Sequence, residues 1–407
     1  MKIGTDFSGI GAPEMALKYL GIDFESVFAC EIDKYARKSF EQLHAPKTFY
    51  NDITTRNHSE VEQLDLYVAG FPCQSFSMAG KRKGFEETRG TLFFNVAKFI
   101  KENKPKCFVL ENVKGLLSHD KGRTFQTIVD VLSNGGGTQN GQISLDVMDD
   151  GLGYHIYWKV LNTKNFGIPQ NRERIFIVGF KDFRDFTFPK EMPLELKLKD
   201  ILEDEVNEKY YLSEKMIESF SNHKERHKEK GTGFQWNPKS GEDVANCLRA
   251  NAALCPTDNT VISHSLQSRG SDRPSVKKNK NARGSGHLSK QDGTSYCLDA
   301  ANSQAVEVIQ LNTSKESRGV QPYQQNRIYD TNGISPALPA ELGGERSHNI
   351  NTKKIRRLTP LECWRLQGFR DEDFHSVKDL SDTQLYKQAG NSITVDVLMH
   401  LFQKIYG

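Results

Sequence analysis

The chain opens with the run Lys2-Ile3-Gly4-Thr5-Asp6-Phe7-Ser8-Gly9-Ile10-Gly11, which reads as a strand followed by a glycine-rich turn. A helical pattern over Ala12–Leu20 follows at once. Glycines in such a turn let the backbone approach a ligand without a clash from Cβ. The run therefore predicts the first βα unit of a ligand-binding α/β fold. Nicotinamide and flavin proteins use similar turns, and a purely structural turn is equally compatible with it.

The alternation of strand and helix continues to residue 180. This rhythm predicts a doubly wound α/β domain with a largely parallel sheet. In such a sheet, ligands bind at the loops that follow the carboxyl ends of the strands. The expected strands are Lys2–Phe7, Ser26–Cys30, Leu64–Gly70, Cys107–Glu111, Tyr154–Asn162 and Arg174–Phe180, and the expected helices are Ala12–Leu20, Lys34–Leu43, Leu92–Asn103 and Thr124–Leu132.

Residues 181–355 lose this rhythm and are rich in Asn, Ser, Gly, Lys and Gln. Similar short runs precede strand starts at Val261-Ile262, Val308-Ile309 and Asn349-Ile350, which indicates either a repeated strand–loop unit or coincidence among common residues. A repeat would make this segment a small β-rich module inserted into the α/β domain. Residues 261–290 are basic, which is typical of a solvated loop or of a loop that contacts phosphates.

Helical patterning returns near the C-terminus. Thr359 is a candidate cap, with Pro360 at the first helical position and Glu362 three residues after the cap. The segment Ser392–Tyr406 is apolar at helical spacing and is expected to pack back on the first domain. The expected domains are a catalytic domain of residues 1–180, completed by 386–407, and a second domain of residues 181–385 that includes 355–369.

Composition excludes several classes of protein. Of the 407 residues 37% are hydrophobic, and no run of the roughly 18 apolar residues that a membrane helix requires is present. The first residues lack the build of a secretory signal, so a cytoplasmic protein is expected. The seven cysteines form no Cys-x-x-Cys pair, and neither a disulfide framework nor a metal site is expected. The net charge of +3 does not identify a nucleic-acid partner.

Two acidic residues follow the next expected strands. Glu31 stands 20 positions after Gly11, where a carboxylate holds ribose hydroxyls in dinucleotide-binding folds. Asp52 follows one strand–loop later and is expected to accept a hydrogen bond from an adenine amino group. Both positions predict a nucleoside-containing cofactor.

The run Gly70-Phe71-Pro72-Cys73-Gln74-Ser75-Phe76-Ser77 presents a cysteine directly after an expected strand, beside a proline that stiffens the turn. Here the sequence resembles the DNA cytosine-5 methyltransferase family, whose Pro-Cys-Gln signature it reproduces. The resemblance covers residues 1–180 and 355–407. Further blocks match the family in order and spacing: Glu111-Asn112-Val113, Gln170-Asn171-Arg172-Glu173-Arg174, Arg356-Arg357-Leu358-Thr359-Pro360-Leu361-Glu362 and Gly390-Asn391-Ser392.

The resemblance implies a Rossmann-like S-adenosylmethionine-dependent methyltransferase domain with an inserted, smaller, β-rich target-recognition domain. Carbon 5 of cytosine is a weak nucleophile, so the Cys73 thiolate would first add at carbon 6. Glu111 would protonate or hydrogen-bond nitrogen 3 and so ease this addition. Arg172 and Arg174 would favour the thiolate over the thiol. A cytosine inside a duplex must be flipped out to reach Cys73.

Further site residues are expected from the same resemblance. The catalytic group is Cys73, Glu111, Arg172 and Arg174. Contacts to S-adenosylmethionine are expected from Phe7, Gly9, Gly11, Glu31, Asp52, Phe71, Leu92, Asn391 and Ser392. Contacts to the target base or the DNA are expected from Pro72, Gln74, Ser77, Asn112, Gln170 and Arg82.

The expected function is that of a site-specific enzyme of bacterial or phage type that protects duplex DNA from a cognate restriction endonuclease. We expect a monomer in the bacterial cytosol, associated with the nucleoid. One alternative is a transfer-RNA cytosine-5 methyltransferase, whose Cys-Phe-Thr element this sequence lacks. Another is a catalytically silent DNA-binding regulator, against which the intact Cys73, Glu111 and Arg172 argue. No code links residues 181–355 to a recognition sequence.

Overall fold

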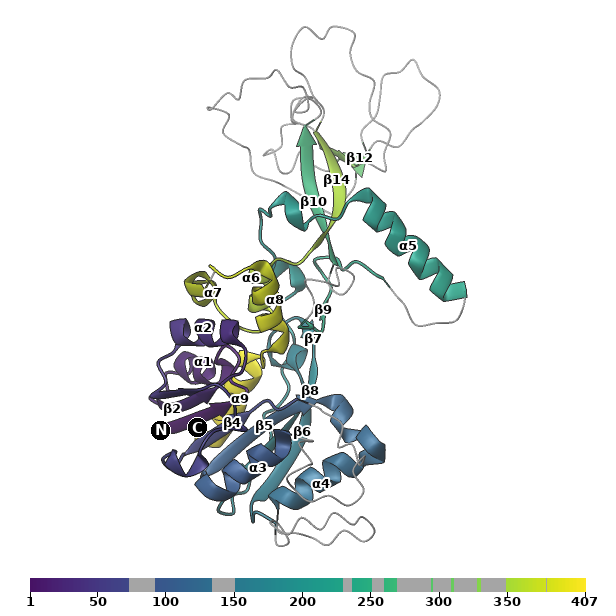
Figure 1. The fold of residues 1–407 in the computed structure, drawn as a ribbon. Coiled ribbons are helices and arrows are strands. Elements are labelled where there is room, and N and C mark those ends of the chain that lie inside the picture. The colour runs from purple at the N-terminus through teal and green to yellow at the C-terminus, as the bar shows by residue number, and fades with distance from the viewer. Residues whose placement is uncertain are drawn as a thin grey trace, which may run out of the picture. The chain divides into compact units, whose positions relative to one another are not determined.

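The computed structural model describes residues 1–72, 92–133, 151–229, 236–250, 260–268, 294–295, 309–310, 328–330, 349–377 and 379–407. The chain forms two compact units (Figure 1). Unit 1 comprises Met1–Tyr210, Gln235–Thr260 and Arg357–Gly407, and unit 2 comprises Tyr211–Phe234 and Val261–Arg356.

Unit 1 is built on a seven-stranded sheet with the order β3-β2-β1-β4-β5-β8-β6. The first five strands in this order are parallel, whereas β8 runs antiparallel to both of its neighbours. Only Thr163–Arg172 separates β6 from β8, which is too short for the dozen or more residues that a parallel crossover requires. The bounds are β1 Lys2–Asp6, β2 Glu25–Cys30, β3 Thr48–Tyr50, β4 Leu66–Ala69, β5 Cys107–Val113, β6 His155–Asn162 and β8 Glu173–Phe180.

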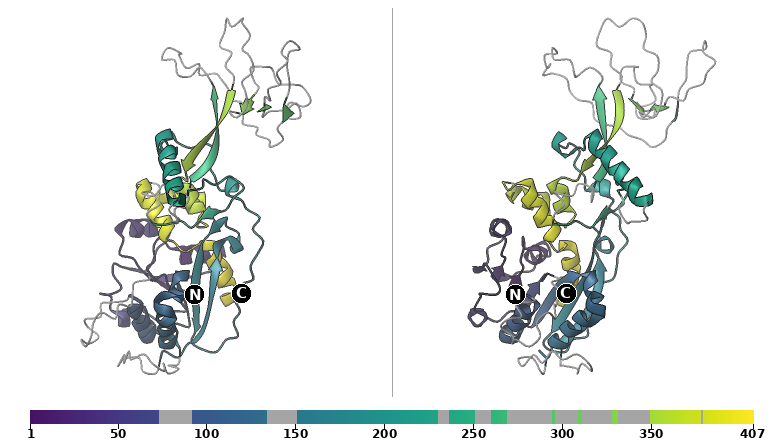
Figure 2. Two further views of the ribbon diagram at one scale, coloured as in Figure 1. Left: turned by 90° about the vertical axis from the view of Figure 1, so that its right-hand side faces the viewer. Right: turned by 45° about the vertical axis from the view of Figure 1, so that its right-hand side comes forward.

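The expected helices are present, with ends within one residue of their predicted bounds in the first 133 residues. The segments that link the elements can be followed from two further sides in Figure 2. Thr359 and Glu362 form the predicted capping box at the start of α6, which begins at Pro360. The helices of unit 1 are α1 Ala12–Tyr19, α2 Lys34–Leu43, α3 Leu92–Asn103, α4 Arg123–Leu132, α6 Pro360–Arg365, α7 Asp371–Val377, α8 Asp382–Asn391 and α9 Val395–Tyr406.

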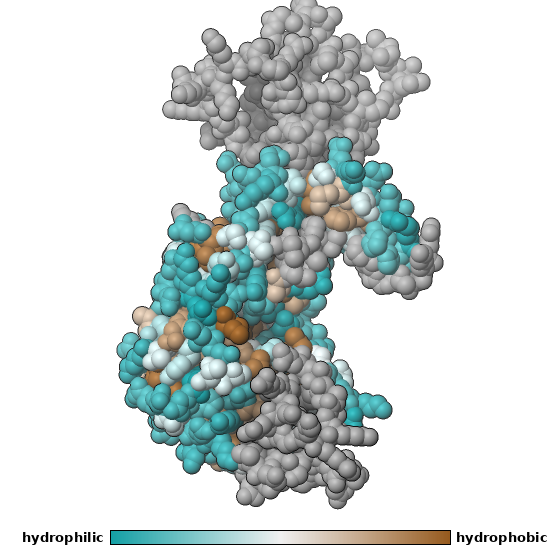
Figure 3. Space-filling model, viewed as in Figure 1, coloured by the Kyte–Doolittle hydropathy of each residue, from teal (hydrophilic) through white to brown (hydrophobic). Residues whose placement is uncertain are grey.

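The sheet is covered on both faces. Phe99 on α3 and Ile128 on α4 share one buried cluster with Phe28, Tyr67 and Phe108 from the strands. The second group of helices includes α1 and α9, which pack against each other, so the C-terminal helix does return to the first domain as predicted. On the face drawn in Figure 3, the described surface of unit 1 is mainly hydrophilic, which fits apolar side chains gathered in these cores.

The order of the strands creates a switch point between β1 and β4. The chain winds from β1 to β2 and β3 on one side, and from β4 to β5 on the other. The loops that leave the carboxyl ends of β1 and β4 therefore diverge and leave a crevice, which is where doubly wound sheets bind ligands.

Unit 2 contains the helix α5 (Glu214–Glu229) and a five-stranded sheet with the order β10-β14-β13-β12-β11. Strands start at Thr260, Ile309 and Asn349, at or beside the three predicted strand starts. Residues 269–290 of the basic run lie outside the described residues, so the β-rich module remains a prediction. The bounds are β10 Thr260–Ser268, β11 Thr294–Ser295, β12 Ile309–Gln310, β13 Ile328–Asp330 and β14 Asn349–Arg357.

The compact units change after Tyr210, Phe234, Thr260 and Arg356, whereas the expected domains change at residues 180 and 386. Two contacts explain why the flanking segments join unit 1. Glu203 N donates to Glu362 Oε1 at 2.8 Å, and Arg365 Nη1 donates to Ile201 O at 2.8 Å. The assignment of residues 181–385 to target recognition stays a prediction. Within the described ranges, no helix is both long and apolar enough to cross a membrane.

Candidate active site

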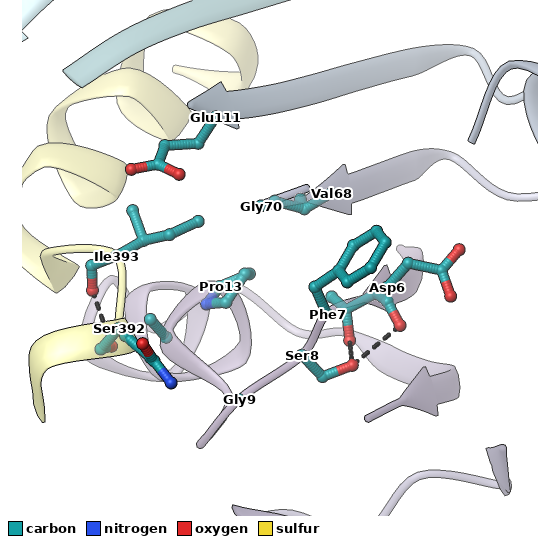
Figure 4. A pocket seen from close by; sticks show the side chains of 13 residues that line it. Asp6, Phe7, Ser8, Gly9, Pro13, Val68, Gly70, Glu111, Ser392 and Ile393 are labelled. Carbon is teal, nitrogen blue, oxygen red and sulfur yellow. Dashed lines mark hydrogen bonds between the residues drawn. The ribbon is translucent and has the colours of Figure 1, made fainter. Parts of the chain in front are cut away.

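A pocket lies at the switch point of the sheet (Figure 4). Its walls come from the turn after β1, the ends of β4 and β5, and the turn between α8 and α9. Glu111 lies on one side of the pocket and Phe7 and Ser8 on another, as Figure 4 shows. The lining residues are Thr5, Asp6, Phe7, Ser8, Gly9, Ala12, Pro13, Val68, Gly70, Glu111, Asn391, Ser392 and Ile393.

The turn after β1 has an unusual backbone. Phe7 adopts a positive φ of 53°, which costs free energy for a residue with a bulky side chain and is found mostly at functional sites. Hydrogen bonds to the end of β2 hold the turn: Ser8 N donates to Cys30 O at 3.0 Å, and Cys30 N donates to Ser8 Oγ at 2.8 Å. Glu31 Oε2 accepts from Gly9 N at 2.9 Å. The turn is therefore fixed at Ser8 to the end of β2 and at Gly9 to Glu31, the residue that follows β2.

Gly11 is required by a close approach. Its φ is 79°, and a Cβ there would lie 2.3 Å from His44 Cδ2. At Gly9, whose φ is 54°, a Cβ would meet nothing within 4 Å. The first glycine of the motif thus leaves open space beside the pocket, whereas the second allows helix α2 and the residues after it to pack closely.

A buried ion pair lies below the same turn. Arg56 binds Asp6 with two hydrogen bonds, of 2.7 and 2.8 Å, and both side chains are fully buried. Tyr67 donates a third bond to Asp6 at 2.7 Å. The guanidinium lies 4.3 Å from the ring centre of Phe28 and 4.5 Å from that of Phe99. The pair ties the loop after β3, which carries Asp52, to the end of β1.

Glu111, at the end of β5, carries a buried carboxyl group that lines the pocket. Arg174 Nε lies 3.0 Å from Glu111 Oε1. A Cβ built on Gly70 would lie 3.6 Å from Glu111 Oε2, which places the carboxyl beside the backbone that leads to Cys73. Burial raises the pKa of Glu111, while the charges of Arg174 and Arg172 oppose the rise. A carboxyl group with a raised pKa is suited to hold and donate a proton.

Arg172 is buried and directs its guanidinium at backbone carbonyls. It donates to Leu248 O at 3.1 Å, to Gly390 O at 3.3 Å and to Ser392 O at 2.8 Å. Burial lowers its pKa, and the charge of Arg174 acts in the same direction. The side chain joins the start of β8 to the turn that carries Asn391, so its geometry indicates a positioning role.

Gly390, the first residue of the Gly390-Asn391-Ser392 block, lies where a larger residue would clash with a neighbouring segment. A Cβ on Gly390 would lie 2.3 Å from the carbonyl carbon of Arg249. The chain around Arg249 therefore passes directly against helix α8. Nearby, Cys247 Sγ lies 3.6 Å from Arg172 Nη1 and 3.8 Å from Arg174 Nη2. The segment around Cys247 thus lies beside two arginines of the candidate site, which the sequence did not suggest.

Two amide side chains that are expected to contact the base form hydrogen bonds with backbone groups. Gln170 donates to Leu366 O at 2.6 Å and accepts from Leu248 N at 3.1 Å, and its side chain is fully buried. Asn112 donates to Phe71 O at 2.8 Å. The first pair of contacts supports the sheet of β7 (Gln170–Asn171) and β9 (Ala245–Asn246), and the second fixes the chain just before Pro72.

The structure brings some of the expected residues together and leaves others apart. Phe7, Gly9, Glu111, Asn391 and Ser392 line one pocket. Other expected cofactor contacts do not line it, namely Gly11, Glu31, Asp52, Phe71 and Leu92. Cys73, Gln74, Ser77 and Arg82 lie outside the described residues, and Pro72 is exposed at their edge.

The environments of the remaining expected residues follow from local contacts. Asp52 Oδ1 accepts from Thr54 N at 2.8 Å, which shapes its own loop. Phe71 is buried 5.5 Å from the ring of Phe93, and Leu92 packs on the same cluster. In the part of the chain that the structure describes, no three His, Cys, Asp or Glu side chains are placed to hold a metal ion.

Comparisons with known proteins bear on this site. The family model described as C-5 cytosine-specific DNA methylase matches residues 1–407. The chain is 34% identical to the orphan methyltransferase M.SPRI of Bacillus phage SPR, over 100% of this chain and 97% of that protein. It is also 34% identical to the type II methyltransferase M.HpaII of Haemophilus parainfluenzae, over 98% and 87% of the two chains.

Solved structures show a similar fold. The Dnmt2 methyltransferase of S. pombe superposes with a TM-score of 0.57 at 15% identity, covering 99% of this chain and 97% of that chain. A mutant DNMT2 of Spodoptera frugiperda superposes with a TM-score of 0.59 at 16% identity, covering 100% and 99%. These likenesses concern the fold alone, whereas the family match extends over all the motif-bearing segments. The chain belongs to the C-5 cytosine-specific DNA methylase family.

Proposed function

We propose that this chain transfers the methyl group of S-adenosylmethionine to carbon 5 of a cytosine in duplex DNA, with Cys73 as the nucleophile. One observation carries the proposal: the glycine turn, the turn around Asn391 and the buried Glu111 line a single pocket. The expected cofactor site and the expected proton donor thus share one cavity, which Gly70, three residues before Cys73 in the chain, also lines.

The residues present fit S-adenosylmethionine. The open space at Gly9 is a cradle that a side chain would fill, and the positive φ of Phe7 places that residue at the pocket wall. Phe7, Gly9, Asn391 and Ser392 would hold the cofactor, and Glu31 would fix the turn from behind through Gly9 N. When bound, S-adenosylmethionine supplies an electrophilic methyl group on a sulfonium.

The chain's own residues would prepare the base. The thiolate of Cys73 forms a bond to carbon 6, and Glu111 stabilises the electron density that moves toward nitrogen 3. Carbon 5 then becomes nucleophilic and takes the methyl group. Loss of the carbon 5 proton to a base, for which water is our candidate, expels Cys73 by elimination.

The two arginines would have different tasks. Arg174 Nε lies 3.0 Å from the carboxyl of Glu111, and its positive charge would favour the thiolate of Cys73 over the thiol. Arg172 donates hydrogen bonds to the carbonyl oxygens of Gly390 and Ser392. It would thereby fix the position of the turn around Asn391, which is expected to hold the cofactor, relative to Glu111. Gln170 and Asn112 would act in the same way, through the backbone of Leu248 and Phe71.

Target recognition would fall to residues outside the pocket. The target base must leave the duplex before it can reach Cys73. We assign duplex binding to the inserted segment of residues 181–385, with Arg82 and the basic run of residues 261–290 as candidate phosphate contacts. Because the relatives include both orphan and type II methyltransferases, we propose a role in protecting DNA from a restriction endonuclease.

Bisulfite sequencing of a plasmid from cells that express the chain tests this proposal. It should report 5-methylcytosine at one short recognition site, and the Cys73→Ser variant should leave the plasmid unmodified. An unmodified plasmid from the wild-type chain, together with methylated cytosine in transfer RNA from the same cells, would overturn the DNA substrate and favour the transfer-RNA alternative.

A further inference from the structure

Glu14, in the first turn of α1, is a fully buried carboxyl group that the proposed mechanism does not use. Its Oε1 accepts a hydrogen bond from Thr5 Oγ1 at 2.8 Å. Its Oε2 is sealed from solvent and has no hydrogen-bond partner among the described residues. A buried carboxylate with an unpaired oxygen is costly and calls for a reason.

The other buried carboxyl groups at the pocket have cationic partners. Asp6 is paired with Arg56, and Glu111 with Arg174. For Glu14, no cationic side chain in the described ranges forms an ion pair, and burial raises its pKa to about 7. Among the buried carboxyl groups beside the pocket in the described ranges, Glu14 is therefore the one without a cationic partner.

Glu14 stands directly behind the wall of the pocket. Its hydrogen-bond partner Thr5 lines the pocket, as do Ala12 and Pro13 from the same turn of the helix. Thr5 Oγ1 also lies 3.0 Å from Ser8 Oγ, and Ser8 lines the pocket too. The Thr5 hydroxyl thus links the carboxyl to two residues that line the cavity, in a low-dielectric setting where charges act over several ångströms.

The cofactor and its product differ in charge. S-adenosylmethionine carries a positive sulfonium, whereas S-adenosylhomocysteine has lost the methyl group and that charge but keeps every other charged group. We propose that Glu14 makes the pocket prefer the cationic methyl donor over its neutral product. The inference rests on the proposed use of S-adenosylmethionine, and it gives the spent cofactor a reason to leave after each transfer.

Isothermal titration calorimetry at pH 8 tests the proposal on the full chain, with three ligands: S-adenosylmethionine, S-adenosylhomocysteine, and an amine analogue that replaces the sulfonium by a protonated amine. Glu14→Gln keeps an acceptor for Thr5 but removes the charge. The variant should lower the ratio of donor affinity to product affinity by about tenfold, equivalent to ~1.4 kcal/mol. The variant should bind the amine analogue more weakly than the wild type does, as it does the methyl donor.

The control is Asp373→Asn, a buried carboxyl group on α7 that binds Tyr19 and does not line the pocket. It should leave the ratio unchanged. If Glu14→Gln loses equal affinity for the donor and for the product, or loses no affinity for either, the inference is overturned while the proposed function stays intact. If Glu14→Gln fails to fold, Glu14→Met replaces it. A wild-type chain that binds none of the three ligands would overturn the proposed function as well.

Discussion

Replacing Glu14 by Gln is expected to stabilise unit 1 at high pH, although the same change weakens binding of the methyl donor. The pKa of the buried carboxyl is raised from 4.5 to about 7. Between these two values the folded state binds more protons than the unfolded state, so stability falls as the pH rises through this window. At 1.36 kcal/mol per pKa unit, the loss is about 3 kcal/mol above pH 7 and near zero below pH 4.5.

Urea unfolding followed by tryptophan fluorescence measures this effect. Trp158, Trp236 and Trp364 all lie in unit 1, so the signal reports on the unit that holds Glu14. The difference in unfolding free energy between Glu14→Gln and the wild type should grow from near zero at pH 4.5 to about 3 kcal/mol in favour of the variant at pH 8. A difference that is independent of pH, or a variant less stable than the wild type at pH 8, would refute the reasoning.

Further predictions concern the packing of the site. Arg56→Met should leave Asp6 buried and unpaired, cost about 3–5 kcal/mol in urea unfolding and weaken cofactor binding in calorimetry, whereas a variant of normal stability would contradict the pairing. Gly390→Ala should drive a Cβ against Arg249 and cost about 1–3 kcal/mol, with loss of methyl transfer in a tritium-transfer assay; full activity would contradict the contact. Arg172→Lys should lower kcat more than cofactor affinity, because it removes hydrogen bonds that position the turn around Asn391 relative to Glu111. An unchanged kcat would contradict this positioning role. Exchanging residues 185–350 for those of a relative should move the methylated site in bisulfite reads, and an unchanged site would exclude the module from recognition.

Local signals in the sequence predicted most of unit 1. The capping box of Thr359 and Glu362 and the glycine turn after β1 formed as expected, because both are set by residues close together in the chain. The antiparallel β8 was not expected, because strand patterns carry no direction. The short link from β6 to β8 was the available signal.

The sequence could not predict contacts between distant residues. Asp6 and Arg56 are separated by α1, β2, α2 and β3, and no sequence motif around either residue predicts the pair. The family resemblance implied that Gln170 contacts the base and that Arg172 favours the thiolate, and it gave no sign of their backbone partners, which only the fold brings near. The buried Glu14 falls on an apolar helix face, where its charge gave no signal of a role.

The boundary of the first compact unit also differs from the domain boundary that was expected from the sequence. The expected boundary was placed at residue 180 because the alternation of strand and helix ends there, but Phe186, Ile201 and Tyr210 are buried in unit 1. These three residues lie outside any β-strand or α-helix, so the end of the alternation does not coincide with the end of the compact unit.

The central claim is that Cys73 attacks carbon 6 of a flipped cytosine. A duplex with 5-fluorocytosine at the methylated position blocks the final elimination, because fluorine cannot leave as a proton does. Incubation with the chain and S-adenosylmethionine should give a protein–DNA adduct that survives denaturing electrophoresis, and peptide mapping should place the DNA on Cys73. The absence of any adduct under conditions where unmodified duplex is methylated, or a bond to another residue, would contradict the account.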